Sequence, residues 1–285
     1  MIYLILLIPM IATVVQNVLY NTVSKASLKE RGDSYYFNIF GYLVCVALFG
    51  IMSFSTGISL YTFLMGILFG ICILLSSVFK MQALKEGPMH ITILITTASM
   101  IIPTLSGAIM FGEPLSIPKL IAVAILIFFI YLSISTPKGD VAEYSIKWAI
   151  LCLITFVFLG AIGVIQKLHQ SSQYKGEAAS FLAVAFICSI IFAVVMSKKQ
   201  KTTKKQGKRF YIISLACGVC YFTMHYLNLK LSGIVSSQIL FPVVNGSAVI
   251  LSSVASVVFF KEQITKRQLI GLVGGLLSLI CICFV

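Results

Sequence analysis

Charged residues are scarce in this 285-residue chain: Asp, Glu, Lys and Arg make up 10% of it, against 59% hydrophobic residues. A soluble domain carries about 25% charged residues, so this composition excludes one. Together with a mean hydropathy of +1.05, it predicts an all-helical integral membrane protein. If each span uses about 20 residues, the chain holds about ten transmembrane helices and has no room for a soluble catalytic domain.

Acidic residues are scarcer still, and none of the 8 Asp and Glu residues lies in the middle of a predicted span. Exchange of a proton for a cationic drug usually requires a carboxylate inside the membrane. The sequence therefore favours anionic or zwitterionic substrates over simple cations. The net charge of +13 indicates loops that face a cytoplasm and anionic lipid, and no nucleic acid partner is expected.

Catalytic and metal-binding patterns are also missing. All 8 cysteines lie in apolar runs, where a thiol behaves as a small hydrophobic group. Cys217 and Cys220 have metal-ligand spacing but lack a second pair of ligands. We find no nucleophile with a neighbouring base and no phosphate-binding loop. The sequence therefore predicts no enzymatic activity, no metal and no cofactor.

The two halves of the chain, 1–140 and 141–285, repeat. Residues 111–121 and 260–270 share an aromatic residue, a glutamate (Glu113 and Glu262), a hydroxyl residue and a Leu-Ile pair. Each half holds five predicted spans, an odd number, so the second copy enters the membrane inverted. We therefore expect two inverted five-helix repeats around a central cavity. The predicted spans are 2–22, 35–54, 60–81, 89–111, 117–135, 146–168, 178–196, 210–230, 234–260 and 268–285.

These motifs resemble those of a known family. The segment Ala83-Leu-Lys-Glu-Gly-Pro88, the turn at Glu113, and their counterparts around Gly233 and Glu262 are similar to those of ten-helix members of the drug/metabolite transporter superfamily, of the EamA type. The resemblance covers the whole length. It implies secondary transport or export of small metabolites by alternating access around a central cavity, and it does not specify the substrate.

Basic residues also predict an orientation in the membrane. Most of the 21 Lys and Arg residues lie in the connections that follow odd-numbered spans, including the basic run 197–209. The positive-inside rule puts these connections in the cytoplasm and both chain termini outside. The family resemblance implies the opposite, with the termini inside. We follow the charge count and expect a multi-pass protein of the cell membrane with residues 197–209 in the cytoplasm.

Two residues at the starts of predicted spans are expected at the membrane interface. Trp148, the single tryptophan, begins the sixth span, and indole rings are enriched at headgroup depth. His90 follows Pro88 at the start of the fourth span. Because Trp148 is placed there, an aromatic cage for an amine would have to use Tyr and Phe.

Polar side chains inside the spans usually face a bundle interior or a wet cavity, because contact with lipid is costly. Helical spacing places Tyr221, His225 and Asn228 on one face. Two alternatives are open: Ser and Thr also bond carbonyls of their own helix, and Asn and Gln also join neighbouring helices. The candidate substrate-binding residues are Asn17, Tyr20, Asn21, Thr96, Ser99, Tyr221, His225, Asn228, Gln238 and Asn245.

Basic residues at the span ends are candidates for charge recognition or coupling. Lys25 and Lys167 occupy corresponding positions in the two halves, and Lys80 and Lys230 end the third and eighth spans. Each lysine either extends to lipid headgroups or points inward to hold a carboxylate or phosphate. His225 is a further candidate, because imidazole titrates near neutrality.

The leading hypothesis is a secondary transporter for a small polar metabolite, amino-acid-like or otherwise zwitterionic or anionic, that works by rocking of the inverted halves. One alternative is an exporter of amines or cationic drugs with a Tyr- and Phe-lined site. Another is a non-transporting membrane partner or flippase-like subunit. The expected partners are a small-molecule substrate and the lipid bilayer, and the protein is expected to be a monomer or a weak homodimer.

Overall fold

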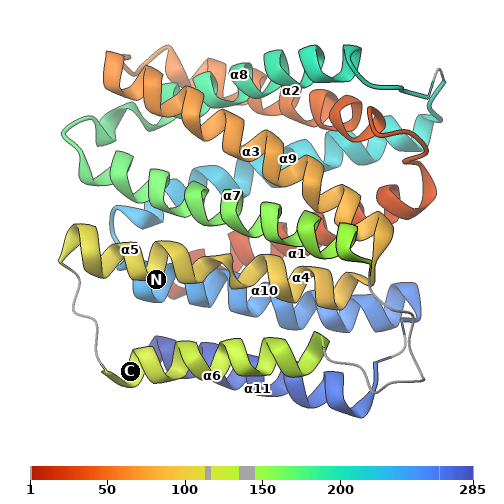
Figure 1. The fold of residues 1–285 in the computed structure, drawn as a ribbon. Coiled ribbons are helices and arrows are strands. Elements are labelled where there is room, and N and C mark those ends of the chain that lie inside the picture. Colours follow the sequence, from red (N-terminus) through yellow and green to blue (C-terminus); the bar gives the residue numbers. More distant parts are fainter. Residues whose placement is uncertain (1, 113–116, 135–144, 204, 263, 285) are drawn as a thin grey trace.

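A computed structural model describes residues 2–112, 117–134, 145–203, 205–262 and 264–284 (Figure 1). Within these ranges the chain forms helices and no strands. Eight of the helical segments are long and apolar enough to cross a membrane. In chain order the elements are α1 (Ile2–Ala26), α2 (Asp33–Ser53), α3 (Leu60–Glu86), α4 (Met89–Thr97), η1 (Ala98–Met100), α5 (Ile101–Phe111), α6 (Ile117–Ile134), α7 (Ile146–Ser171), η2 (Lys175–Glu177), α8 (Ala178–Lys198), α9 (Lys208–Ser232), α10 (Ser237–Phe260) and α11 (Lys266–Phe284).

The predicted fourth span, residues 89–111, is not one continuous α-helix. A 3₁₀ turn, η1, separates α4 from α5. Proline has no N–H, so Pro103 cannot donate the usual helical hydrogen bond to the carbonyl of Ser99. Short 3₁₀ stretches within helices often mark functional positions. The interruption places Ser99 and Met100 at the middle of the span.

Neighbours in space are often distant in sequence (Figure 1). Helix α2 packs against α8 and α9, and α3 packs against α7 and α8. Helices α6 and α11 pack on each other at the opposite side of the molecule from α2 and α8. The largest apolar core lies where α2, α3 and α8 meet, and it includes Phe49, Phe69, Phe181 and Phe186.

Two glycines bring α3 and α8 close together. Cβ atoms added at Gly66 and Gly70 would lie 2.9 Å from a methyl of Val184 and 2.2 Å from the carbonyl oxygen of Ala185. Ser189 of α8 also donates a hydrogen bond of 2.8 Å to the carbonyl of Gly70. Small residues let membrane helices approach until their backbones touch. This contact between α3 of the first half and α8 of the second therefore depends on the missing side chains.

Trp148 is not the interfacial anchor that its position in the sequence predicts. It is only 2% exposed, and its indole Nε1 donates a hydrogen bond of 3.0 Å to the hydroxyl of Thr92 in α4. Gly87, directly after α3, leaves room for the ring, since a Cβ there would lie 2.3 Å from Nε1. The indole thus packs inside the protein and joins α7 to the connection between α3 and α4.

We predict that Gly70→Ala destabilises the protein while Gly50→Ala does not. A Cβ at Gly70 would overlap the Ala185 carbonyl, whereas a Cβ at Gly50 meets nothing within 4 Å. Overpacking costs roughly 1–3 kcal/mol. Thermal unfolding of the purified variants in detergent measures the difference. Equal unfolding temperatures for the two variants would contradict the close contact of α3 and α8.

Candidate functional site

A cavity of about 100 Å³ lies between helices of both halves. Side chains of α1, α3, α4, η1 and α5 line it from the first half, and side chains of α7, α9 and α10 line it from the second. Among the described lining residues there is no Asp or Glu, and in the described ranges no three His, Cys, Asp or Glu side chains gather as metal ligands. Its polar and basic lining residues are Thr13, Gln16, Tyr20, Ser76, Ser77, Lys80, Thr97, Ser99, Gln166, Tyr221, His225, Asn228 and Asn245.

Several candidate residues from distant parts of the sequence meet at this cavity. The helical spacing of α9 directs Tyr221, His225 and Asn228 to it, and α10 contributes Asn245. Ser99 reaches it from η1, at the interruption of the fourth span. Tyr20 completes this group from α1.

Other candidate residues lie outside the cavity lining. Thr96 donates a hydrogen bond of 2.8 Å to the carbonyl of Thr92 in its own helix. Asn17 joins two neighbouring helices, as described below. Asn21 is fully buried in α1, and neither atom of its amide has a partner among the described residues. Gln238 is buried in the first turn of α10.

Tyrosine hydroxyls hold four helices together at one wall of the cavity. The hydroxyl of Tyr20 donates a hydrogen bond of 2.9 Å to Oδ1 of Asn38 and contacts the hydroxyl of Tyr221. The Tyr221 hydroxyl also contacts that of Ser77. These contacts connect α1, α2, α3 and α9, so both hydroxyls are already engaged within the protein.

His225 lies in an aromatic pocket next to this cluster. Its ring stacks on that of Tyr221 with centroids 5.7 Å apart, and the rings of Phe69 and Phe186 meet it edge-on at 5.6 Å. Its Nδ1 is buried and has no hydrogen-bond partner among the described residues. A ring fixed on three sides by aromatic neighbours presents a defined face to the cavity.

Of the four lysines at span ends, Lys25, Lys80, Lys167 and Lys230, Lys80 lines the cavity. It is 9% exposed, and its Nζ donates a hydrogen bond of 2.6 Å to Oδ1 of Asn17. The Nδ2 of Asn17 in turn donates a hydrogen bond of 3.0 Å to the hydroxyl of Ser252 in α10. Lys80 lies three and four residues after Ser77 and Ser76, a spacing that puts all three on one helix face. This polar stripe is the sequence signal that singles out Lys80.

The remaining three lysines contact other parts of the protein. Lys25 pairs with Glu262 at 2.9 Å. The Nζ of Lys167 lies 5.8 Å from the ring centroid of Phe111, and that of Lys230 lies 6.0 Å from the ring centroid of its helix neighbour Tyr226. Among the described lining residues of the cavity, Lys80 is the single cation apart from the titratable His225.

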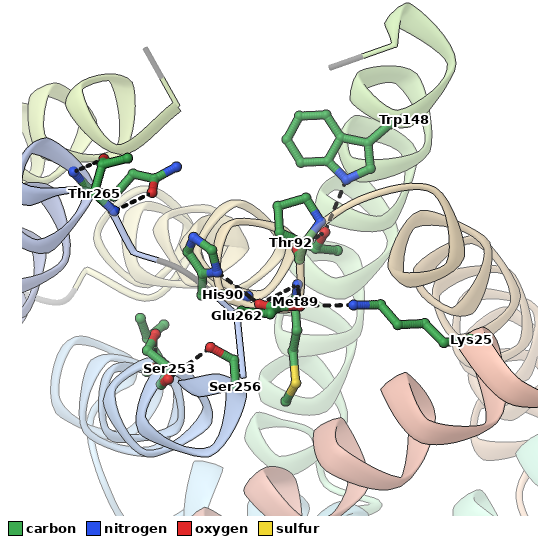
Figure 2. A network of polar contacts seen from close by, with 12 residues as sticks. Lys25, Met89, His90, Thr92, Trp148, Ser253, Ser256, Glu262 and Thr265 are labelled. Atoms are coloured by element: carbon green, nitrogen blue, oxygen red, sulfur yellow. Dashed lines mark hydrogen bonds and ion pairs between the residues drawn. The ribbon is translucent and has the colours of Figure 1, made fainter. Parts of the chain in front are cut away.

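Glu262 connects the two halves at one end of the bundle (Figure 2). Its carboxylate accepts hydrogen bonds from Nζ of Lys25 at 2.9 Å, from the backbone N–H of Met89 at 2.9 Å and from Nδ1 of His90 at 2.8 Å. The negative charge therefore lies at the N-terminus of α4, where unpaired N–H groups and the helix dipole favour an anion. His90 is 3% exposed at its side chain, so it belongs to this network and not to the lipid interface. Glu113, the counterpart of Glu262 in the first half, lies outside the described residues.

These contacts change the acidity of Glu262. Partial burial by itself raises its pKa, but the hydrogen bonds from His90, Lys25 and the Met89 N–H outweigh burial and lower the pKa from 4.5 to about 2. Because the folded-state pKa lies below the ordinary value, the ionised carboxylate stabilises the fold above about pH 4.5. That contribution is lost as the pH falls toward 2.

We predict that Glu262→Gln lowers the free energy of unfolding at pH 7 and that this deficit shrinks between pH 4.5 and 2. By linkage, the pH-dependent part is on the order of 3 kcal/mol. Unfolding of the purified protein at several pH values measures it. Glu86→Gln is the control, because the Glu86–Lys147 pair is largely exposed and such pairs stabilise little. A deficit for Glu262→Gln that is independent of pH would contradict the shifted pKa.

Known proteins resemble this chain in fold and in part of its sequence. The crystal structure of another protein superposes with a TM-score of 0.70 at 12% identity, covering 98% of this chain and 97% of that one, which shows a common fold. Over 188 residues the chain is 20% identical to an uncharacterised protein of Haemophilus influenzae. That match covers 65% of this chain and 63% of the relative, so the chain spans less than two thirds of the relative's length.

A family assignment comes from the second half of the chain. Residues 146–284 match the model of the EamA-like transporter family. The match includes the whole of α7, α8, α9, α10 and α11. It therefore covers the elements that line the cavity from the second half. This part of the chain therefore belongs to the EamA-like transporter family, within the drug/metabolite transporter superfamily, as the sequence predicted.

Proposed function

We propose that this multi-pass membrane protein is a secondary transporter that moves a small polar metabolite across the cell membrane. The observation that carries the proposal is the cavity, because polar residues from both halves line it. A solute held between two halves can be exposed to either side when the halves rock. A polar cavity of this kind has no role in a non-transporting partner subunit, so transport is the better explanation.

The packing of the helices supports an inverted-repeat architecture. In this comparison α7, α8, α9 and α11 correspond to α1, α2, α3 and α6, and α10 corresponds to α4 and α5 together. With this correspondence, most contacts between helices occur in matched pairs. Helix α1 packs on α9 and α7 packs on α3, while α2 packs on α9 and α8 packs on α3. Counterparts also pack on each other, as α2 does on α8 and α6 on α11. Such matched contacts are expected when two copies of one unit face each other about a two-fold axis. On this basis we propose ten transmembrane helices, α6 and α11 included.

The charge of the cavity supports an anionic or zwitterionic substrate. A cationic drug would need a carboxylate or an aromatic cage inside the membrane. Tyr20, Tyr221 and Phe241 offer aromatic faces, but the cation of Lys80 lies in the same lining and repels an amine that carries no negative group. An amino-acid-like solute carries both charges and suits this lining better.

Alternating access requires separable contacts at each end of the cavity. The Glu262 network is suited to this, because it joins the ends of α1 and α4 to the α10–α11 connection through one carboxylate. Water can replace such polar contacts when the halves rock. By contrast, the close packing at Gly70 is apolar and backbone-to-backbone, which suits a contact that persists.

We predict that proteoliposomes containing the protein exchange labelled amino acids or small carboxylates in counterflow, and that Ser76→Phe abolishes the exchange. Ser76 lines the cavity, and among the described residues its hydroxyl bonds only the carbonyl of Ile73 in its own helix. A phenyl ring there therefore fills the solute space. Thr223→Phe is the matched control, since Thr223 lies outside the cavity lining and its hydroxyl also bonds a carbonyl of its own helix. Uptake no greater than in empty vesicles across the panel would count against transport.

The orientation follows from the basic run 197–209, which the positive-inside rule puts in the cytoplasm. We therefore predict that both termini lie outside. A C-terminal reporter that is active only in the cytoplasm should be inactive, whereas the same reporter inserted near residue 202 should be active. Activity of the C-terminal fusion would reverse this orientation and agree with the orientation implied by the family resemblance.

A further inference from the structure

The ammonium group of Lys80 is buried with one neutral partner. It donates to Oδ1 of Asn17 at 2.6 Å, and an ammonium carries three N–H donors. In the described part of the chain, the ion pairs are those of Lys25 and His90 with Glu262 and of Lys147 with Glu86, so none involves Lys80. Donors of Lys80 are therefore available to a solute in the cavity that it lines.

The position of this ammonium is set by two further helices. Asn17 of α1 donates through Nδ2 to the hydroxyl of Ser252 in α10 at 3.0 Å, which directs Oδ1 toward Lys80. The chain of contacts Lys80–Asn17–Ser252 thus runs from α3 through α1 to α10 and crosses between the two halves. A lysine that merely extended to lipid headgroups would not need a fixed acceptor at cavity depth.

Stability alone does not explain a buried lysine here. Removing a charge from water without an opposite charge is costly, and apolar residues of similar volume usually stabilise such positions as well or better. Intramembrane ionisable residues are for this reason usually functional. The missing negative charge is most simply supplied by whatever occupies the cavity.

Other unpartnered polar atoms border the same space. Gln166 of α7 is 2% exposed, and its Nε2 donor has no partner among the described residues. On α9, Oδ1 of Asn228 and Nδ1 of His225 are likewise unpartnered there. All three residues line the cavity with Lys80. Buried polar atoms are almost always hydrogen-bonded, so these atoms require water or a solute. A cavity of about 100 Å³ accommodates several waters or one small molecule.

We propose that Lys80 binds the carboxylate of the transported solute, with Gln166 as a second donor and Asn228 as an acceptor for the ammonium or hydroxyl group at the solute's other end. This assignment rests on the proposed transport function and specifies its substrate class: small solutes with one carboxylate, amino acids first among them. Ammonium–carboxylate pairing supplies the charge balance that the cavity lacks. Asn17 is a positioning residue in this site, because it acts through Lys80.

A binding experiment in detergent tests the site without requiring transport. Thermal shifts of the purified full-length protein are first measured with each proteinogenic amino acid. For every amino acid that stabilises the protein, the measurement is repeated with its primary amide and with its decarboxylated amine. Ligands that bind the folded state raise its unfolding temperature. We expect the acids to stabilise the wild type and the amides and amines to lose that effect. Absence of stabilisation by any amino acid or small monocarboxylate would overturn the proposal, as would stabilisation by the amides or amines alone.

Variants of Lys80 complete the test. Lys80→Met should fold at least as well as wild type, since it removes a buried charge, and should bind a stabilising acid about 10- to 100-fold more weakly. Lys80→Arg should retain part of the affinity. Lys85→Met is the matched control, because Lys85 is exposed and its Nζ bonds a backbone carbonyl of Lys29 outside the cavity. Undiminished binding by Lys80→Met would overturn the proposal. If Lys80→Met fails to fold, equal binding of acid and amide by Lys80→Arg overturns it, while a retained preference for the acid supports it.

Two further arms separate the possible outcomes. The thermal-shift measurement also includes inorganic phosphate and phosphorylated small solutes. If these compounds stabilise the protein in a way that depends on Lys80, and carboxylates do not, the carboxylate assignment is overturned. Counterflow with the same acids distinguishes the two proposals. Binding that depends on Lys80 without counterflow would retain the site and reject the transport function, whereas counterflow that is unchanged in Lys80→Met would retain transport and reject the site.

Discussion

Polar groups inside a membrane helix must find their partners within the protein or in enclosed water, because lipid tails offer none. Most of the structure around the cavity follows from this constraint. Tyr20 and Tyr221 both donate hydrogen bonds to Oδ1 of Asn38. The side-chain amide of Asn17 accepts a hydrogen bond from Lys80 through its oxygen and donates one to Ser252 through its nitrogen. Each of these contacts joins two different helices, and most of them join helices that are far apart in the sequence. Satisfying the polar groups therefore also positions the walls of the cavity.

The same constraint explains which polar atoms are informative about function. Where the protein supplies a partner, as for Thr96 on its own helix, the polar group is accounted for by structure. Where it does not and the residue also lines the cavity, as for Gln166, His225 and Asn228, water or a solute in the cavity can supply the partner. Among the lining residues, satisfied and unsatisfied atoms thus separate residues that join helices from residues that are available to a solute.

Contacts between the two halves are of two physical kinds. Against α8, the glycines of α3 allow backbone contact that any side chain would disrupt, and such packing behaves as a rigid unit. At the α4 end, one carboxylate gathers Lys25, His90 and a backbone N–H, and water can substitute for these partners. The proposed rocking of the halves needs both kinds, a persistent interface and one that separates, and the two lie on different helices of this fold.

Composition and apolar runs alone predicted the helical segments and their membrane character, and the motifs around Glu262 indicated the family resemblance, because both are local properties of the chain. Helical spacing likewise placed Tyr221, His225 and Asn228 on one face. Only the tertiary structure decided which neighbour each face meets. It buried Trp148 against Gly87 where an interfacial anchor was expected, paired Lys25 with Glu262, and turned Lys80 toward Asn17. The reason is physical: the spacing along a helix specifies the direction of a side chain within that helix, but its partner lies on another helix whose position depends on the packing of the whole bundle.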